Sequence, residues 1–560
     1  MASYMLKINH KTKKLLVFLL ITIMIVTCFP QASYAFTRIV DLVFDGMSVE
    51  PDKLSEVLDT VRINKIKNKN IKISKKRKPD KLFIVQARQE DSKNIQLEID
   101  TSEVIVKSSQ DIQGAISNKA FLDAISEAVK LWDDVDIADV TFAPLKFGSG
   151  QANFEDGRNI VTFRAIETPE GTPEGASAIS IITYARTNTV LFMNKLIMVK
   201  PGSILDADII YDPTNNPCLA LHTTQGSFKA GGDNSAIVEG GVDSSLSADD
   251  LKSCKVITAG DLTDLAVRLI ANVLGLESSA IASAATSPVG QIMTRYALTS
   301  DDKIGLANIY PNTEFLTTSG ELAGEVTLNN KKVKGAHVVV ESTLTGEPVA
   351  STITNLLGQF IIKAIPAGIY NVYAEPLDGP ARSAALVRNF FAFKPDLNLS
   401  TGLFPSPVKI NANEATKIKI EVKELSASAF NINYLTGVLT EADVNKSGGA
   451  FLLPIRVMPG ETLTDVQFWG SNISPSFGTL SVSGSGITVS NVREDKNISI
   501  SPFIGDPPPD VLPGIKADIT CDEDVLPGPR NIIFTGNMID ITHPSFGLRD
   551  QITGGLFVVE

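Results

Sequence analysis

Two stretches of the sequence decide which fold to expect. Residues 261–278 read DLTDLAVRLIANVLGLES, and residues 298–311 read LTSDDKIGLANIYP. In the first stretch apolar residues recur every three or four positions, at Leu262, Leu265, Leu269, Val273 and Leu276. This spacing predicts an amphipathic helix with one face on a core, ending at Gly275. Arg268 and Asn272 are four positions apart, so they share one face of that helix.

These stretches, with Met293 between them, resemble the zinc-binding half of matrixin-type (metzincin) metalloproteases. In that family the first stretch carries HExxHxxGxxH, a Met-turn follows, and a closing helix of the form LSxDDxxGIxxLYP ends the domain. Arg268, Asn272 and Ser278 stand at the three histidine positions. Leu269 stands at the position of the glutamate. The resemblance implies an α+β metzincin-like domain over residues 93–311 with a degenerate site.

The replaced residues remove the chemistry of such a site. A hydrolytic zinc needs three neutral imidazoles and a carboxylate that acts as general base. Arg268 is a permanent cation that repels a divalent ion, and Leu269 cannot accept a proton. Asn272 and Ser278 are weak, neutral ligands. We therefore expect no catalytic residues, no bound zinc and no matrixin-type hydrolysis.

Histidine is scarce along the whole chain. After the first 35 residues the only histidines are His222, His337 and His543. The last two lie beyond residue 311, so three histidines cannot meet within one domain. One enzymatic alternative stays open, a secreted matrixin-family zinc metalloendopeptidase that uses a displaced ligand set from residues 212–260.

The rest of the first domain alternates helix and strand signals. We expect a helix from Ser117 or Asn118, strands over 136–142 and 160–163, and a turn at 156–159. The apolar face of the helix consists of Phe121, Leu122, Ile125, Ala128, Val129 and Trp132. Residues 202–211 resemble the strand that borders the cleft in active family members.

Acidic residues gather between positions 206 and 250. They are Asp206, Asp208, Asp233, Asp243, Asp249 and Asp250. Matrixin-like folds often hold structural calcium, but no EF-hand spacing organises these carboxylates. We therefore favour an acidic, solvated loop, with structural calcium as the alternative.

The first 35 residues have the features of a secretory signal peptide. A basic start precedes the apolar run 15–29, and Ser33-Tyr34-Ala35 supplies a cleavage pattern. Cys28 as a lipidation site is the alternative. We expect a secreted or cell-surface (or periplasmic) protein, cleaved near Ala35, with no transmembrane segment in the mature chain.

The remaining N-terminal residues, 36–92, are assigned to an extension with a basic linker. Residues Arg62–Lys78 contain lysine and arginine and no acid, whereas the whole chain has a net charge of −12. The basic run is interpreted as a mobile linker, with an anionic-surface contact or an activation site as alternatives. The acidic balance argues against nucleic acid as a partner.

Cysteine usage fits an oxidising compartment. Cys218 and Cys254 are close enough in sequence to close a disulfide in an exported protein. Cys521 shares strand phase with Ile515, Ala517 and Ile519, so we expect it to be a buried, inert thiol.

The region 320–425 changes to short strands and tight turns, which predicts a β-sandwich. Turns are expected at Asn329-Asn330 and at Thr345-Gly346. The pattern of glycines and strands resembles carboxypeptidase regulatory-like (transthyretin/Cna-B-like) modules. His337 lies in an alternating segment, and we interpret it as structural rather than as a ligand.

The region 428–560 is also rich in strands with period-two alternation. Residues 526–533 and 554–559 resemble bacterial Ig-like repeats, while the proline run 507–509 interrupts the pattern. Trp469 is expected in the core rather than as a platform for sugars.

The fold class expected is therefore multidomain, with an α+β metzincin-like domain followed by two all-β sandwich domains. This organisation favours a catalytically inactive binding or scaffold protein at the cell surface or outside the cell. Its partner would be a protein, a peptide or an envelope glycan.

Overall fold

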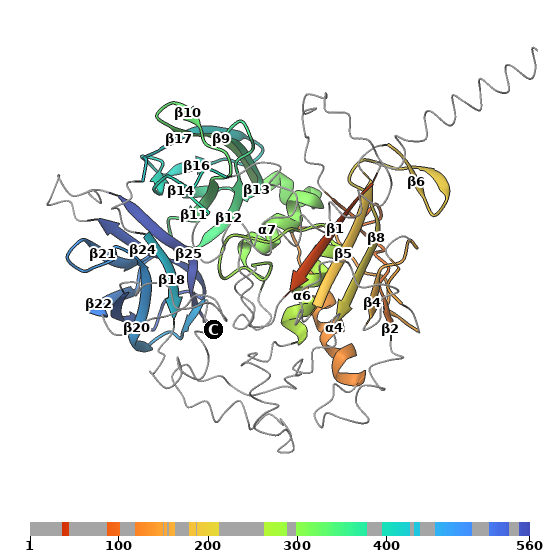
Figure 1. Ribbon diagram of the computed structural model, residues 1–560, viewed down its shortest axis with the longest axis horizontal. Helices are drawn as coiled ribbons and strands as arrows, with labels where there is room; N and C mark the ends of the chain where they lie inside the picture. The colour runs from red at the N-terminus through yellow and green to blue at the C-terminus, as the bar shows by residue number, and fades with distance from the viewer. Residues whose placement is uncertain are drawn as a thin grey trace, which may run out of the picture.

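The protein is described here from a computed structural model (Figure 1). The described residues are 36–43, 87–100, 118–148, 151–153, 156–162, 178–185, 188–211, 262–287, 298–377, 395–425, 431–436, 454–495, 514–536 and 548–559. The signal peptide, the basic linker, the Cys218–Cys254 disulfide and Met293 lie outside these residues, so they stay predictions.

A six-stranded mixed sheet forms the centre of the first domain, in the order β1-β5-β8-β4-β2-β3 (Figure 1). Its strands are β1 (Phe36–Val43), β2 (Glu98–Asp100), β3 (Lys146–Gly148), β4 (Ile160–Thr162), β5 (Ala178–Ala185) and β8 (Ile204–Tyr211). β5 runs antiparallel to both of its neighbours, whereas β8, β4, β2 and β3 are mutually parallel. Strand β1 differs from the expectation, which left its residues in an extension outside the sheet. β6 (Thr189–Phe192) and β7 (Lys195–Met198) form a separate hairpin.

Two helices contribute buried apolar residues to this domain's core. α4 (Asn118–Asp133) and α6 (Leu262–Val273) pack against each other, and the indole of Trp132 donates to the Val267 carbonyl at 2.9 Å. The predicted stop of α6 is confirmed, because Gly275 has a φ of 90°. A Cβ atom there would lie 2.1 Å from the Ala87 carbonyl oxygen, so the site requires glycine.

The closing helix is α7 (Ser300–Ile309), which begins with a capping box between Thr299 and Asp302. The hydroxyl of Tyr310 donates to the Leu274 carbonyl at 2.7 Å, which fixes the end of α7 against the end of α6. The short helix α8 (Thr313–Thr318) then leads into the next domain.

The predicted strand over 136–142 is wrong. Burial does alternate along this segment, which explains the prediction. However, only isolated bridges form there, between Ala138 and Pro311 and between Ile95 and Phe142. The segment passes between two different neighbours, so no continuous ladder develops.

The second domain is a sandwich of two sheets. One sheet has the order β10-β9-β13 with β17 beside β9, and the other has β12-β11-β14 followed by β15 and β16. The strands are β9 (Ser319–Leu328), β10 (Lys331–Lys332), β11 (His337–Ser342), β12 (Pro348–Ile353), β13 (Gln359–Pro366), β14 (Gly368–Glu375), β15 (Gly402–Leu403), β16 (Val408–Ile410) and β17 (Ala415–Val422). The predicted turn at Asn329-Asn330 is confirmed, with φ values of 49° and 62°.

The third domain is a second sandwich, with sheets in the orders β18-β20-β23-β22 and β19-β25-β24-β21. The strands are β18 (Asn431–Thr436), β19 (Ile455–Val457), β20 (Thr462–Ser471), β21 (Gly478–Val482), β22 (Ile487–Asp495), β23 (Gly514–Cys521), β24 (Gly528–Gly536) and β25 (Arg549–Val558). Cys521 is buried and free, which confirms its interpretation as a core thiol. The side chain of Trp469 lies outside the described part.

Strands outweigh helices in the described chain, and the second and third domains are all-β sandwiches. The largest buried apolar clusters lie mainly within the first domain, within the second and within the third. No helix among the described segments is long and apolar enough to cross a membrane.

Candidate functional site

Helix α6 buries the residues that the metzincin resemblance aligns with zinc ligands. Arg268 and Asn272 are each 5% exposed, and Leu269 is fully buried in the core of the first domain. Burial lowers the pKa of the Arg268 guanidinium to about 10, so it remains a cation at neutral pH. This helix face therefore carries a buried cation where the family resemblance places the metal.

Ser278 follows the end of α6 and is half-buried. It lines a pocket of about 160 Å³ that lies between the segment 276–286, α7 and the strands β11 and β12. Met293, His222 and residues 212–260 lie outside the described segments, so a displaced ligand set is not tested.

Asp206 and Asp208 form a buried carboxylate pair on β8, so the expected solvated loop is wrong at these two positions. Both side chains are inaccessible to solvent. One oxygen of Asp206 accepts hydrogen bonds from the Asp156 and Gly157 amides at 3.0 and 2.8 Å. Asp208 accepts from the Ile160 amide at 3.1 Å. The predicted turn at 156–159 supplies both donors to Asp206, whereas the donor to Asp208 is the first residue of β4.

Burial, followed by the nearby charge of Asp206, raises the pKa of Asp208 to about 9. The buried pair therefore holds a proton to a higher pH than a free aspartate does. Within the described ranges, no group of three or more His, Cys, Asp or Glu residues is placed to hold a metal ion. Structural calcium stays a prediction.

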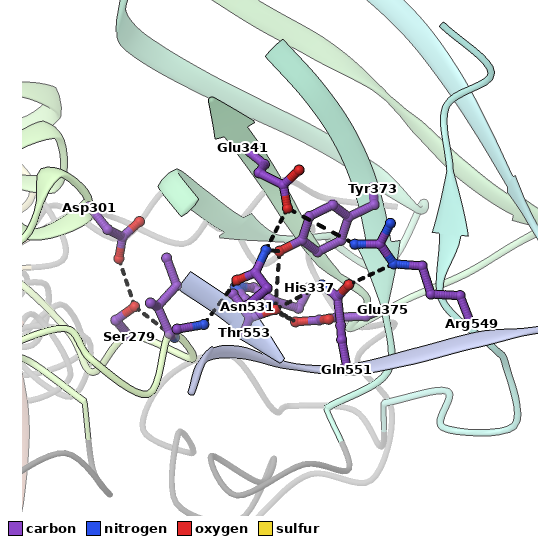
Figure 2. A network of polar contacts seen from close by, with 12 residues as sticks. Ser279, Asp301, His337, Glu341, Tyr373, Glu375, Asn531, Arg549, Gln551 and Thr553 are labelled. Carbon is purple, nitrogen blue, oxygen red and sulfur yellow. Dashed lines mark hydrogen bonds and ion pairs between the residues drawn. The ribbon is translucent and has the colours of Figure 1, made fainter. Parts of the chain in front are cut away.

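A second set of buried polar residues joins the domains (Figure 2). On β11, His337 Nδ1 lies 2.7 Å from Glu375 Oε1 on β14. The same carboxylate oxygen accepts from the hydroxyl of Thr553 on β25 at 2.8 Å. Thr553 also lies 3.1 Å from the Tyr373 hydroxyl. His337 is 1% exposed.

Asn531 on β24 is the centre of this junction. Its amide group donates to Glu341 at 2.6 Å and to the Tyr373 hydroxyl at 2.9 Å, both on the second domain. Its carbonyl oxygen accepts from the Gly554 amide at 2.9 Å. Figure 2 shows Glu341, Tyr373 and Asn531 converging, with Arg549 against the tyrosine ring.

A tight turn strengthens the contact between the two sandwiches. Gly346 has a φ of 73°, which confirms the turn predicted there, and its carbonyl accepts from the Ser483 hydroxyl at 2.6 Å. A Cβ atom on Gly346 would lie 2.2 Å from the Gly484 nitrogen. Glycine therefore allows the two backbones to touch.

The end of the first domain is tied to the same junction. Ser279 donates to Asp301 at 2.6 Å, and the Ala282 amide donates to the Thr553 carbonyl at 2.9 Å. On α7, the Ser300 hydroxyl donates to Glu347 at 2.7 Å. The three domains thus share one polar contact region.

Sequence reasoning missed this junction because its partners are distant in the chain. A local signal did exist for some of its members. Glu341, Glu375 and Asn531 occur in or directly beside apolar strand runs, where an uncompensated polar group is costly. Such residues predict a buried polar partner but not which one.

Comparisons with known proteins assign neither a family nor a function to this chain. No family model matches the chain, and no curated protein matches it. Among solved structures, the chain is similar to the minor pilin GBS52 of Streptococcus agalactiae, with 11% identity over 20% of this chain and 46% of that chain, and a TM-score of 0.13. The major pilin SpaD of Corynebacterium diphtheriae shows 8% identity over 42% and 63%, with a TM-score of 0.15.

A DUF3823 family protein from Parabacteroides merdae shows 11% identity over 43% of this chain and all of that chain, with a TM-score of 0.13. The chain thus spans about half of GBS52 and just under two thirds of SpaD. Similarities at this level do not bear on function. The sandwich architecture is established by the sheets themselves, and the metzincin resemblance rests on the sequence motifs.

Proposed function

We propose that this chain is an exported binding or scaffold protein whose metalloprotease-like first domain is not catalytic. The observation that carries the proposal is the closed environment of α6. A hydrolytic centre needs an open coordination position and a carboxylate beside it. The described helix instead presents buried Arg268 and Asn272, with Leu269 inside the core.

The polar junction supports a scaffold role. Buried polar networks whose members are paired favour one arrangement of the groups that they connect. Asn531, Glu341 and Thr553 connect the two sandwiches in this way, and Ala282 extends the connection to the first domain. Surfaces on three domains would then be held in a fixed mutual orientation, which suits a protein that presents binding sites.

The partner best supported by the fold is an extended peptide. β1 pairs with β5 over its whole length, and α6 contacts both strands (Figure 1). This edge of the sheet therefore accepts an antiparallel strand through backbone hydrogen bonds, as in binding by strand addition. In the free protein the chain's own residues 36–43 fill it, and a partner segment would replace them.

The test uses the mature chain and a labelled peptide with the sequence of residues 36–43. Neighbouring backbone amides point to opposite sides of a strand, so one of the amides of Val40 and Asp41 faces β5. Replacing both residues by proline therefore removes one backbone hydrogen-bond donor to β5. The variant should bind the peptide saturably, while the wild type and a scrambled peptide should show at least about tenfold weaker binding. Equal binding by wild type and variant would remove the peptide proposal.

Catalysis is tested in the same preparations. A mixture of quenched fluorescent peptides should not be cleaved by the mature protein, with or without added zinc. Cleavage that disappears with a chelator and returns with zinc would instead establish the displaced-ligand protease.

A further inference from the structure

A pocket beside the junction has the lining of a small binding site. It has a volume of about 160 Å³ and opens between the segment 276–286, α7 and the strands β11, β12 and β13. This volume corresponds to only a few water molecules, each of which occupies about 30 Å³ in the liquid. A ligand group must therefore be small, such as the end of a side chain or a short alkyl chain.

One wall of the pocket includes a histidine whose second ring nitrogen is buried without a hydrogen-bond partner. His337 lines the pocket, whereas its partner Glu375 does not. Donation from His337 Nδ1 to this carboxylate is the arrangement that makes Nε2 the acceptor of a neutral imidazole. The lone pair of Nε2 is then free on the opposite edge of the ring, and that atom is buried with no hydrogen-bond partner. His337 itself is 1% exposed.

Asp301 supplies the charge. Its carboxylate lines the pocket and accepts from the Ser279 hydroxyl at 2.6 Å. The neighbouring Asp302 has a different role, because its two oxygens accept from backbone amides and hydroxyls of Thr286 and Thr299. Asp302 therefore holds the local loop together, and Asp301 is the carboxylate that a ligand can use.

The remaining lining fixes the class of ligand. The charged lining residues are Glu277, Asp301 and Asp302, and the lining contains no lysine or arginine. Its apolar members include Leu276, Ile304, Ala350, Ile353 and Ile362. Within the described ranges, no three of the His, Cys, Asp or Glu residues, here or elsewhere, are placed so that they could hold a metal ion. A negative site with apolar walls and two acceptors suits a cationic donor on an alkyl chain.

We propose that this pocket binds a primary alkylammonium group, with Asp301 and His337 Nε2 accepting its hydrogen bonds. The group would be either a free amine or a lysine side chain of a partner protein. The two sources share this chemistry and differ only in what lies outside the pocket. The site is independent of the strand edge at β5.

The experiment titrates the full mature chain with n-butylammonium, using long-range proton–nitrogen spectra of the imidazoles. The mature chain has three histidines, and His337→Gln identifies the signal of residue 337. We expect saturable binding and a shift of the Nε2 signal of His337. Asp301→Asn should weaken binding by at least about tenfold, since it removes a charge-assisted hydrogen bond. Asp524→Asn, an exposed change elsewhere, should leave it unchanged.

Two further ligands complete the test. 1-Butanol, the neutral analogue, should bind much more weakly than n-butylammonium, and N-acetyl-lysine methylamide should bind if a partner's side chain is the source. Rejection of the lysine derivative with retention of the amine would assign a free amine. Equal binding of butanol, no effect of Asp301→Asn in a protein with unchanged circular dichroism, or an Nε2 that carries hydrogen in the free protein would overturn the proposal.

Discussion

Polar groups are buried in two parts of this molecule, and the two parts treat them differently. In the first domain, burial is the main cause of two pKa shifts. It lowers the pKa of Arg268 and raises the pKa of Asp208, so in both cases it favours the uncharged form. At the junction, the groups are paired across domains, as Asn531 is with Glu341 and Tyr373. Burying a charge is costly, whereas a network of polar groups paired across domains can specify one arrangement of those domains.

The two regions differ in what their buried polar groups contact. The face of α6 that the metzincin resemblance marks as the site is packed as part of a core. A further set of specific polar contacts lies between the domains.

The largest effect should follow from restoring the glutamate of the family motif. Leu269→Glu places a carboxylate in the core, so we expect the free energy of unfolding to fall by about 4 kcal/mol. Leu269→Met keeps the volume and apolar character, and it should cost less than about 1.5 kcal/mol. Denaturant unfolding measures both. A tolerated glutamate would show that this face of α6 opens into a groove.

The junction is probed by Asn531→Ala. The change leaves Glu341 and Tyr373 buried without their amide partner, so it should cost about 3 kcal/mol. Asn398→Ala removes an exposed hydrogen bond to Glu424 and serves as the control, with a loss below about 0.5 kcal/mol. Similar melting temperatures for the two variants would mean that the junction does not hold the domains together.

The carboxylate pair gives a pH dependence. The pKa of Asp208 rises from 3.8 to about 9 on folding, so the native state keeps a proton that the unfolded chain releases. The contribution of Asp208 to stability therefore declines as the pH rises from about 4 to about 9. Asp208→Asn should remove this decline and stabilise the protein by about 2 kcal/mol at pH 8, an estimate reduced for relaxation around the charge. Parallel pH profiles for variant and wild type would contradict the assignment.

The smallest effect concerns the pocket. Burial is the main cause that raises the pKa of Asp301 to about 6. Only the ionised carboxylate attracts an ammonium group, so affinity for n-butylammonium should rise by about tenfold between pH 5 and pH 7. His337, Glu277 and Asp302 also line the pocket, and comparison with Asp301→Asn separates the share of Asp301 from theirs. The same pH profile in that variant would assign the dependence to another group.

Local patterns predicted the elements well. The apolar repeat of α6, the glycine at its end and the turn at Asn329-Asn330 all follow from backbone and burial rules that act within a few residues. The strand over 136–142 failed because alternating burial also arises in an extended segment held between different neighbours. Alternating hydrophobicity indicates which side of an extended segment is buried. It does not show that the segment forms a continuous ladder of backbone hydrogen bonds with one neighbouring strand.

The candidate sites were less accessible from sequence. Glu375 and Thr553 meet across 178 positions, and nothing local relates them. Composition assigned Asp206 and Asp208 to an acidic loop. However, the two aspartates are two positions apart and are followed by apolar Ile209 and Ile210, which is the pattern of two side chains on one face of a strand. The strand signal was the better guide, because an apolar neighbourhood outweighs local charge when a sheet forms.

The most direct test of the central claim is zinc binding by the mature protein. Metal content should be measured after equilibration with a zinc buffer that holds the free ion near about 10 nM, a level at which protein sites of zinc enzymes fill. The account predicts far less than one zinc per chain and no difference between wild type and Asn272→Ala. One tightly bound zinc per chain, lost in that variant, would contradict it.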